Sequence, residues 1–94
     1  MLYSVYATFK PDAEERRDEL HEQFNQHLMQ RFIHIRVAGP MFDEDRRRTG
    51  ILLLIEADDI EKVRHFVRIS PYTEANLYDT IEIRELDVQV GRLG

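Results

Sequence analysis

The residues best suited to chemistry at neutral pH are four histidines, at positions 21, 27, 34 and 65. An imidazole titrates near neutrality, so a histidine beside a cleft can act as a general acid or base. His21 and His27 fall on the two shoulders of the apolar stripe of one predicted helix, between core and solvent. His34 is predicted on a strand face turned away from the helices, either at the rim or in a ligand cavity. His65 lies opposite the apolar stripe of a second helix and is predicted to face solvent.

The histidines do not predict a metal site. His21 and His27 point away from each other, whereas two ligands of one ion on a helix need i, i+4 spacing. The sequence contains no cysteine, which excludes a disulfide, a thiolate zinc site and a cysteine nucleophile. It also lacks a glycine-rich phosphate loop and a nucleophile-elbow motif. We therefore predict no metal, no nucleotide and no other cofactor.

Periodic patterns indicate the elements that position these histidines. Alternation predicts strands, and apolar residues every three or four positions predict helices. The order strand, helix, strand, strand, helix, strand is typical of a ferredoxin-like βαββαβ sandwich of the α+β class. We expect a single domain over residues 1–94, with an antiparallel four-stranded sheet and two helices on one face. The predicted strands are Leu2–Phe9, Phe32–Ala38, Gly50–Ala57 and Leu77–Val90, the first helix spans Ala13–Arg31, and the second follows Asp58.

Capping residues predict where the helices begin. Asp12 and Asp58 are each followed three residues later by a glutamate, as in a capping box. Ser70 precedes Pro71, and proline is tolerated at the first helical position, so a further short helical turn is expected there. The dipeptide Gly39–Pro40 is predicted to end the second strand.

The two central strands carry apolar residues on both faces. The third strand is apolar from Ile51 to Ile55, and the first places Leu2 and Tyr6 on its second face. A two-layer sandwich leaves that face exposed, so something must cover it. We expect a second copy of the chain, giving a homodimer through the sheet face (a dimeric α/β barrel) with ligand space at the interface edge. A change of phase between Ile83 and Leu86 predicts a bulge, after which the C-terminal tail reaches the partner.

Charge and hydropathy restrict the partners of the chain. Thirteen basic and 18 acidic residues give a net charge of −5, which repels phosphate backbones, so nucleic acid is not a predicted partner. The one basic run, residues 46–48, follows three acidic residues and is predicted to be a solvated hairpin loop. The longest apolar run has five residues, against about 20 needed to cross a bilayer. Because the N-terminus also lacks an export signal, we expect a soluble cytoplasmic protein that does not contact a membrane.

Three motifs are more specific than the order of the elements. Ala38-Gly39-Pro40 ends the second strand, Gly50 begins the third, and Ser70-Pro71-Tyr72 precedes Leu77-Tyr78. Together with the opening strand and the helix that carries His21, these motifs resemble the YCII-related (YciI-like) family. The resemblance covers nearly the whole chain and implies a ferredoxin-like fold with dimeric α/β-barrel architecture.

The resemblance also implies a site. Its members are expected to pair a histidine on the first helix with the aspartate of an Asp-Pro-Tyr motif at the dimer cleft. His21 matches the histidine, after a one-residue difference in the turn that follows the helix. Ser70 stands where the aspartate is expected, and Asn76 replaces a family glycine. A serine can orient an imidazole but adds no charge, so Asp18 and Glu74 are the candidate substitute acids.

Two functions from different classes follow from this resemblance. Some relatives are associated with lyase-type elimination on chlorinated hydroquinones, which favours an enzyme with His21 as general acid or base and Ser70 beside it. The missing aspartate favours instead a non-catalytic ligand-binding or accessory dimer. A cofactor-free monooxygenase-like dimer is a third alternative that rests on fold analogy. The side chains expected to contact a small organic ligand are Tyr6, His34, Arg36 and Tyr72.

Overall fold

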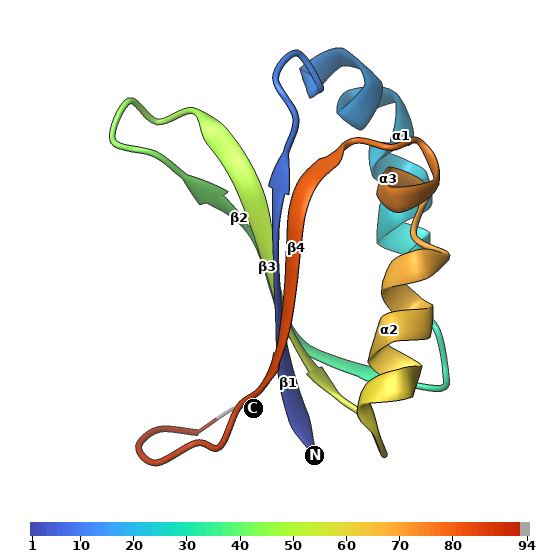
Figure 1. The fold of residues 1–94 in the computed structure, drawn as a ribbon, viewed down its shortest axis with the longest axis vertical. Helices are drawn as coiled ribbons and strands as arrows, with labels where there is room; N and C mark the ends of the chain where they lie inside the picture. Colours follow the sequence, from blue (N-terminus) through green and yellow to red (C-terminus); the bar gives the residue numbers. More distant parts are fainter. Residues whose placement is uncertain (93–94) are drawn as a thin grey trace.

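Four antiparallel strands form one layer, and three helices lie together on one face of this sheet (Figure 1). The computed structural model describes residues 1–92. The strands are β1 (Leu2–Phe9), β2 (His34–Phe42), β3 (Arg48–Glu56) and β4 (Tyr78–Glu85), and the helices are α1 (Glu14–His27), α2 (Ile60–Arg68) and α3 (Pro71–Glu74). The spatial order β2-β3-β1-β4 places β3 and β1 in the centre, as expected. The predicted ferredoxin-like α+β sandwich is confirmed, and α3 is the predicted short turn after Ser70.

The strand register explains which residues form the core. Directly opposed residues of an antiparallel pair share a face, so alternate residues of β1 and β3 point toward the helices. These residues are at most 3% exposed and pair across the strands: Tyr3 with Ile55, Val5 with Leu53, and Ala7 with Ile51. Phe24 of α1 and both Val63 and Phe66 of α2 complete the core from the helical layer.

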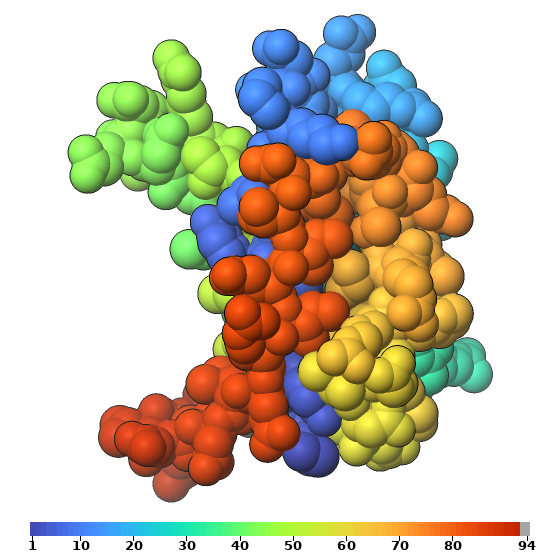
Figure 2. Space-filling view, viewed as in Figure 1, coloured from blue at the N-terminus to red at the C-terminus, as the bar shows by residue number. Residues whose placement is uncertain are grey.

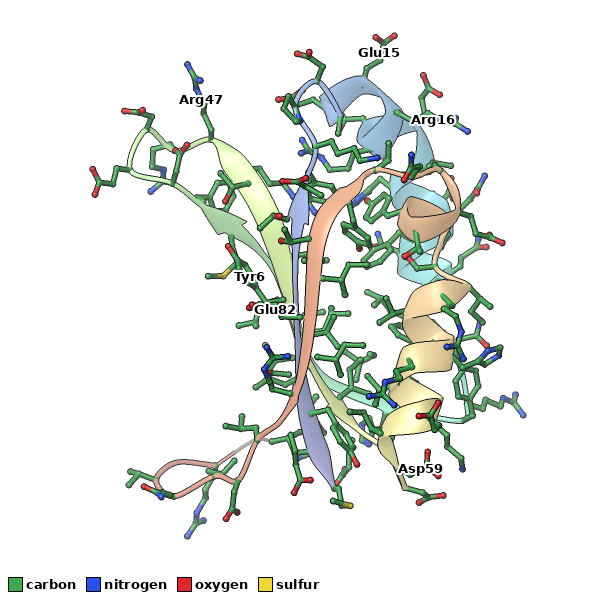
Figure 3. The ribbon with its side chains drawn as sticks, viewed as in Figure 1. Tyr6, Glu15, Arg16, Arg47, Asp59 and Glu82 are labelled. Carbon is green, nitrogen blue, oxygen red and sulfur yellow. The ribbon has the colours of Figure 1, made fainter. Side chains whose placement is uncertain are left out.

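The opposite face of the sheet, which we call the open face, has no helix over it. Tyr6 and Glu82 lie on this side (Figure 3), and Leu52 and Leu54 share it by register. The β2–β3 hairpin and the segment after β4 both extend away from the helices (Figure 1) and border a hollow in the molecular surface (Figure 2). Leu54 and residues 86–92 line a groove of about 440 Å³ in this region. No helix within residues 1–92 is long and apolar enough to cross a membrane.

The helix starts differ from the sequence-based expectation. Asp12 has a φ of 64°, and Ala13 occupies the N-cap position of α1 without a side-chain hydrogen bond, so the predicted capping box at Asp12 is wrong. Asp59, rather than Asp58, caps α2 by accepting a 3.1 Å hydrogen bond from the Lys62 amide. Asp58 instead forms an ion pair of 2.8 Å with the Lys62 ammonium group. The first helix also ends earlier than predicted, at residue 27.

The outer strands differ in length and phase from the prediction. β2 continues through Gly39–Pro40, because an edge strand tolerates a proline whose missing N–H is not needed for pairing. A register shift within β2 turns Val37 to the open face. β4 ends before Leu86, so the expected bulge near that residue is not in the strand. The register shift of β4 lies at its other end, opposite Phe9.

Candidate functional site

His21 and Ser70, the predicted catalytic pair, lie in different environments. His21 is on the exposed side of α1, and its Nε2 is 3.2 Å from the side-chain nitrogen of Asn25. Ser70 precedes α3 and is 3% exposed, and its hydroxyl has no hydrogen-bond partner among residues 1–92. The Ser70 side chain also does not cap α3. No hydrogen bond within the described chain therefore joins His21 to Ser70.

The four predicted ligand-contacting residues are divided between the two faces of the sheet. Tyr6 faces the open side (Figure 3). His34 Nδ1 and Arg36 Nη1 lie 3.8 and 3.2 Å from the same carboxylate oxygen of Glu56. Tyr72 is completely buried on the helical side of the sheet. The structure therefore does not bring Tyr72 and Tyr6 together within one chain.

His27 is a buried structural residue. Its Nε2 donates a 2.8 Å hydrogen bond to the carbonyl oxygen of Phe66, and the two rings stack with centroids 4.1 Å apart. The side-chain nitrogen of Gln30 lies 3.4 Å from Nδ1, as expected for a neutral imidazole protonated at Nε2. Burial lowers the pKa of His27, and the hydrogen bond to Phe66 opposes part of that shift. The expected position between core and solvent is wrong, since His27 is 6% exposed.

A different group of side chains surrounds Phe9, at the end of β1 that leads into α1. The guanidinium carbons of Arg17 and Arg48 lie over the Phe9 ring, 5.3 and 5.7 Å from its centroid. Tyr72 contacts the ring edge-on at 5.5 Å, and Tyr78 stacks on it at 5.4 Å. The rings of Tyr72 and Tyr78 are also edge-on to each other at 6.1 Å. We call these five residues the Phe9 cluster.

Five elements meet to form the Phe9 cluster. The residues come from β1 (Phe9), α1 (Arg17), β3 (Arg48), α3 (Tyr72) and β4 (Tyr78). The register shift pairs Tyr78 with Phe9, whereas Thr80 pairs with Thr8. In an unshifted strand residues 78 and 80 would share one face, so the extra residue between them turns Tyr78 toward the helices.

Polar atoms in and beside the cluster are buried without a hydrogen-bond partner. They are Nε of Arg17, Nε of Arg48, the hydroxyl of Tyr72, and the hydroxyls of its chain neighbours Ser70 and Thr73. Most buried polar atoms in native proteins are bonded to protein or to ordered water. A concentration of unbonded donors therefore indicates a place where another molecule can bind. Within residues 1–92, no three His, Asp or Glu side chains are grouped as metal ligands.

The cluster combines one buried cation, Arg17, and one half-buried cation, Arg48, with neutral phenols. Burial lowers the pKa of Arg48, and the positive charge of Arg17 lowers it further. Burial raises the pKa of Tyr72 and of Tyr78, so both phenols are protonated at neutral pH and can donate hydrogen bonds. The prediction that residues 46–48 form a solvated loop is wrong for Arg48, which is half-buried at the start of β3.

The helical spacing of α1 could have indicated that Arg17 is buried, but no pattern indicated this for Arg48. Arg17 is spaced four positions from Ala13 and three from Leu20, so it lies on the apolar stripe of α1. A charged residue on such a stripe is expected to be paired or functional, because burying an unpaired charge is costly. Arg48 gives no comparable signal, because it is the last of three consecutive arginines after an acidic run.

The enclosed space beside the cluster is too small for an organic molecule. Ser70, Tyr78 and Phe24 help to line a cavity of about 10 Å³. That volume is close to the minimum for one water molecule, about 10–15 Å³. A ligand at the Phe9 cluster must therefore displace a side chain.

Comparison with known proteins places this fold in a family. A family model described as the YCII-related domain matches residues 1–87. The chain belongs to the YCII-related family. A solved YCII-like structure, 5-chloro-2-hydroxyhydroquinone dehydrochlorinase from Burkholderia phenoliruptrix AC1100 in complex with 2,5-dihydroxybenzoquinone, is similar with a TM-score of 0.79. The two chains are 24% identical, and the match covers 93% of this chain and 94% of the other. No match was found among the curated proteins.

The YCII assignment confirms the family resemblance drawn from the motifs. The likeness to the dehydrochlorinase shows a shared fold over almost the whole of both chains. His21, which the resemblance matched to a family histidine, is exposed, and Ser70, which was expected in place of an aspartate, is buried. The catalytic roles of His21 and Ser70 therefore remain predictions.

Proposed function

We propose that this YCII domain binds a small organic molecule at the Phe9 cluster. The observation that carries the proposal is the set of buried donors without partners, to which Arg17, Arg48 and Tyr72 each contribute one atom. The cluster combines aromatic surface with a few convergent polar groups, which is the usual composition of a small-molecule site. The similar dehydrochlorinase structure contains a bound dihydroxybenzoquinone, which supports a ligand of about that size.

Binding is tested by NMR titration of the ¹⁵N-labelled protein with hydroquinones, quinones and aromatic acids. We expect chemical-shift changes centred on the backbone amides of Phe9, Arg48 and Tyr72. Tyr72→Phe removes one unpaired donor and keeps the ring, so it should weaken binding about tenfold. Tyr3→Phe, at the end of β1 opposite Phe9, is the matched control and should bind like the wild type. Shift changes confined to the open face would contradict the proposed location.

Acid–base catalysis by His21 is the more specific form of the proposal. His21 follows Arg17 by one helical turn, so the two side chains are neighbours on α1. The ring of His21 is exposed and can approach a ligand that enters beside Arg17. In an elimination of HCl it would accept the proton while chloride leaves, with Ser70 supplying a hydroxyl but no charge.

A non-catalytic ligand-binding or accessory protein is the second candidate function. The observation that favours it is the partner of His21, the neutral amide of Asn25, where a catalytic imidazole is usually oriented by a carboxylate. Chloride release from a chlorinated hydroquinone distinguishes the two functions. We expect activity to be lost in His21→Gln and kept in His65→Gln, an exposed histidine on α2. Ligand binding without chloride release would support the non-catalytic function.

We further propose that two copies associate through the open face. Val37 and Met41 are each 39% exposed there, and Leu86 and Val88 beyond β4 are 39% and 44% exposed. Leu54 adds an apolar surface at the centre of the same face. A second copy would remove these side chains from water, because an isologous contact places the same patch on both partners.

A further inference from the structure

The two arginines of the Phe9 cluster lack the close glutamate partners that three other arginines have. The three others are Arg16, which pairs with Glu19, Arg36, which pairs with Glu56, and Arg64, which pairs with Glu61. The Arg17 side chain is only 10% exposed, and its one ion-pair contact is a distant 3.9 Å approach to Asp18. Asp18 itself is 76% exposed, so water screens its charge. Arg48 forms no ion pair with any of residues 1–92.

The Phe9 cluster therefore holds two positive charges that the surrounding protein does not neutralise. Both guanidinium groups lie over one aromatic ring, and each leaves its Nε buried without an acceptor. Burying unpaired charges of the same sign is unfavourable, and an anion between them would remove both the repulsion and the unbonded donors. The planar fork of a guanidinium group matches a carboxylate, which it can bind through two parallel hydrogen bonds.

We propose that the ligand of the Phe9 cluster is an aromatic carboxylate, whose anionic group is bound by Arg17 and Arg48 and whose ring packs against Phe9 and Tyr78. This inference rests on the proposed function and names the class of ligand for the same site. Tyr72 donates its hydroxyl proton to the carboxylate, because that hydroxyl has no other acceptor among the described residues. Its raised pKa keeps the phenol protonated at neutral pH.

The test compares acids with neutral molecules of the same shape. Benzoate and 4-hydroxybenzoate are titrated against the wild-type protein by calorimetry and NMR, in parallel with benzamide and 4-hydroxybenzamide. Because a charge-assisted hydrogen bond is stronger than a neutral one, we expect the acids to bind at least about tenfold more tightly than the amides. Acetate should compete weakly, since it lacks the ring.

Substitutions then test whether the preference for acids over amides depends on the two arginines of the Phe9 cluster. Arg48→Gln should remove the preference for acids, whereas Arg47→Gln, with the same change of charge at the exposed end of the hairpin (Figure 3), should keep it. Arg17→Gln should act like Arg48→Gln, with Arg16→Gln as its control. A preference that survives both Arg17→Gln and Arg48→Gln, or that is lost equally in the exposed controls, would overturn the assignment.

The remaining outcomes separate this inference from the proposed function. If amides and acids bind the cluster equally well, the small-molecule site stands and the carboxylate class is wrong. If neither class perturbs the cluster, both are wrong. A measurement without ligand gives a further check: Arg48→Met should not lower the melting temperature, because it removes an unpaired charge while keeping an apolar stem. A clear decrease, absent in Arg47→Met, would assign Arg48 to stability and overturn its role in binding.

Discussion

The imidazole of His27 donates a 2.8 Å hydrogen bond to the carbonyl oxygen of Phe66 and stacks on the ring of the same residue. Phe66 lies in the last turn of α2, where helix carbonyls lack the usual partner four residues later. His27 is the last residue of α1, so this single side chain joins the C-terminal ends of two helices. Its burial explains why a histidine at helical spacing from Phe24 is part of the core and not of a catalytic site.

The first prediction is that His27 makes stability dependent on pH. Burial lowers the pKa of folded His27 below that of the unfolded chain, about 6.5, so the unfolded chain binds the proton more readily. The stability that neutral His27 contributes is therefore complete above about pH 6.5, and it decreases as the pH falls toward the pKa of His27 in the folded chain. His27→Gln keeps a hydrogen-bond donor but does not titrate. Urea unfolding at about pH 7.5 and pH 5 should show that the wild type loses more unfolding free energy on acidification than His27→Gln does. Equal losses in the two proteins would contradict the prediction.

A side chain at Gly50 is predicted to destabilise the fold where β3 pairs with β1. A Cβ at this position would collide with the backbone carbonyl oxygen of Ala7, so Gly50→Ala must push the two central strands apart. We expect a loss of about 1–3 kcal/mol in the free energy of unfolding. Gly39→Ala is the matched control, because a Cβ there meets nothing within 4 Å. Similar denaturation midpoints for the two variants would show that the close approach is absent.

Leu54→Asp is predicted to separate the proposed dimer. The substitution places a charge in the centre of the apolar open face, where association would bury it without a partner. Light scattering at micromolar concentration should show a dimer for the wild type and a monomer for Leu54→Asp, with exposed apolar surface that reduces solubility. Met29→Asp, at a residue that is 79% exposed after α1, is the control and should remain dimeric. A monomeric wild type would contradict the proposal.

The layers of the molecule could be predicted from local patterns, because alternation alone determines which strand residues face the helices. That is why Tyr6 could be predicted on the second face of the first strand, and it lies on the open face, opposite Leu52. The helix caps could not be predicted as well. Adjacent aspartates compete for one cap, and the choice of Asp59 depends on backbone angles that the sequence does not reveal.

The Phe9 cluster could not be predicted, because it depends on contacts between elements far apart in the chain. Arg17 and Tyr72 meet Phe9 only after α1 and α3 pack together. Tyr78 joins them through a one-residue register shift, and a shift of one residue reverses the face on which a strand side chain lies. The family resemblance assigned His21 and Ser70 to one site, but a motif match does not determine that the Ser70 side chain is buried while His21 is exposed.

The last prediction concerns Tyr78 and Ser70 in alkaline solution. Burial raises the pKa of Tyr78 above the ordinary value of 10.0, and the hydroxyl of Ser70 opposes part of this shift by favouring the phenolate. Although the Ser70 hydroxyl makes no hydrogen bond of normal geometry, it lies close enough to Tyr78 to have this effect. The folded chain thus keeps a proton that the unfolded chain releases. The stability contributed by Tyr78 is complete below about pH 10 and is lost as the pH rises further.

Tyr78→Phe should therefore reduce the loss of stability between about pH 8 and pH 10.5, measured as the shift in the urea midpoint, because phenylalanine does not ionise. Ser70→Ala should leave that loss unchanged, because the folded Tyr78 phenol stays protonated up to about pH 10.5 with or without the Ser70 hydroxyl. The double variant should therefore behave like Tyr78→Phe, because the loss in this pH range comes from ionisation of Tyr78 in the unfolded chain. A Tyr78→Phe variant that loses as much stability as the wild type over this range would contradict the prediction.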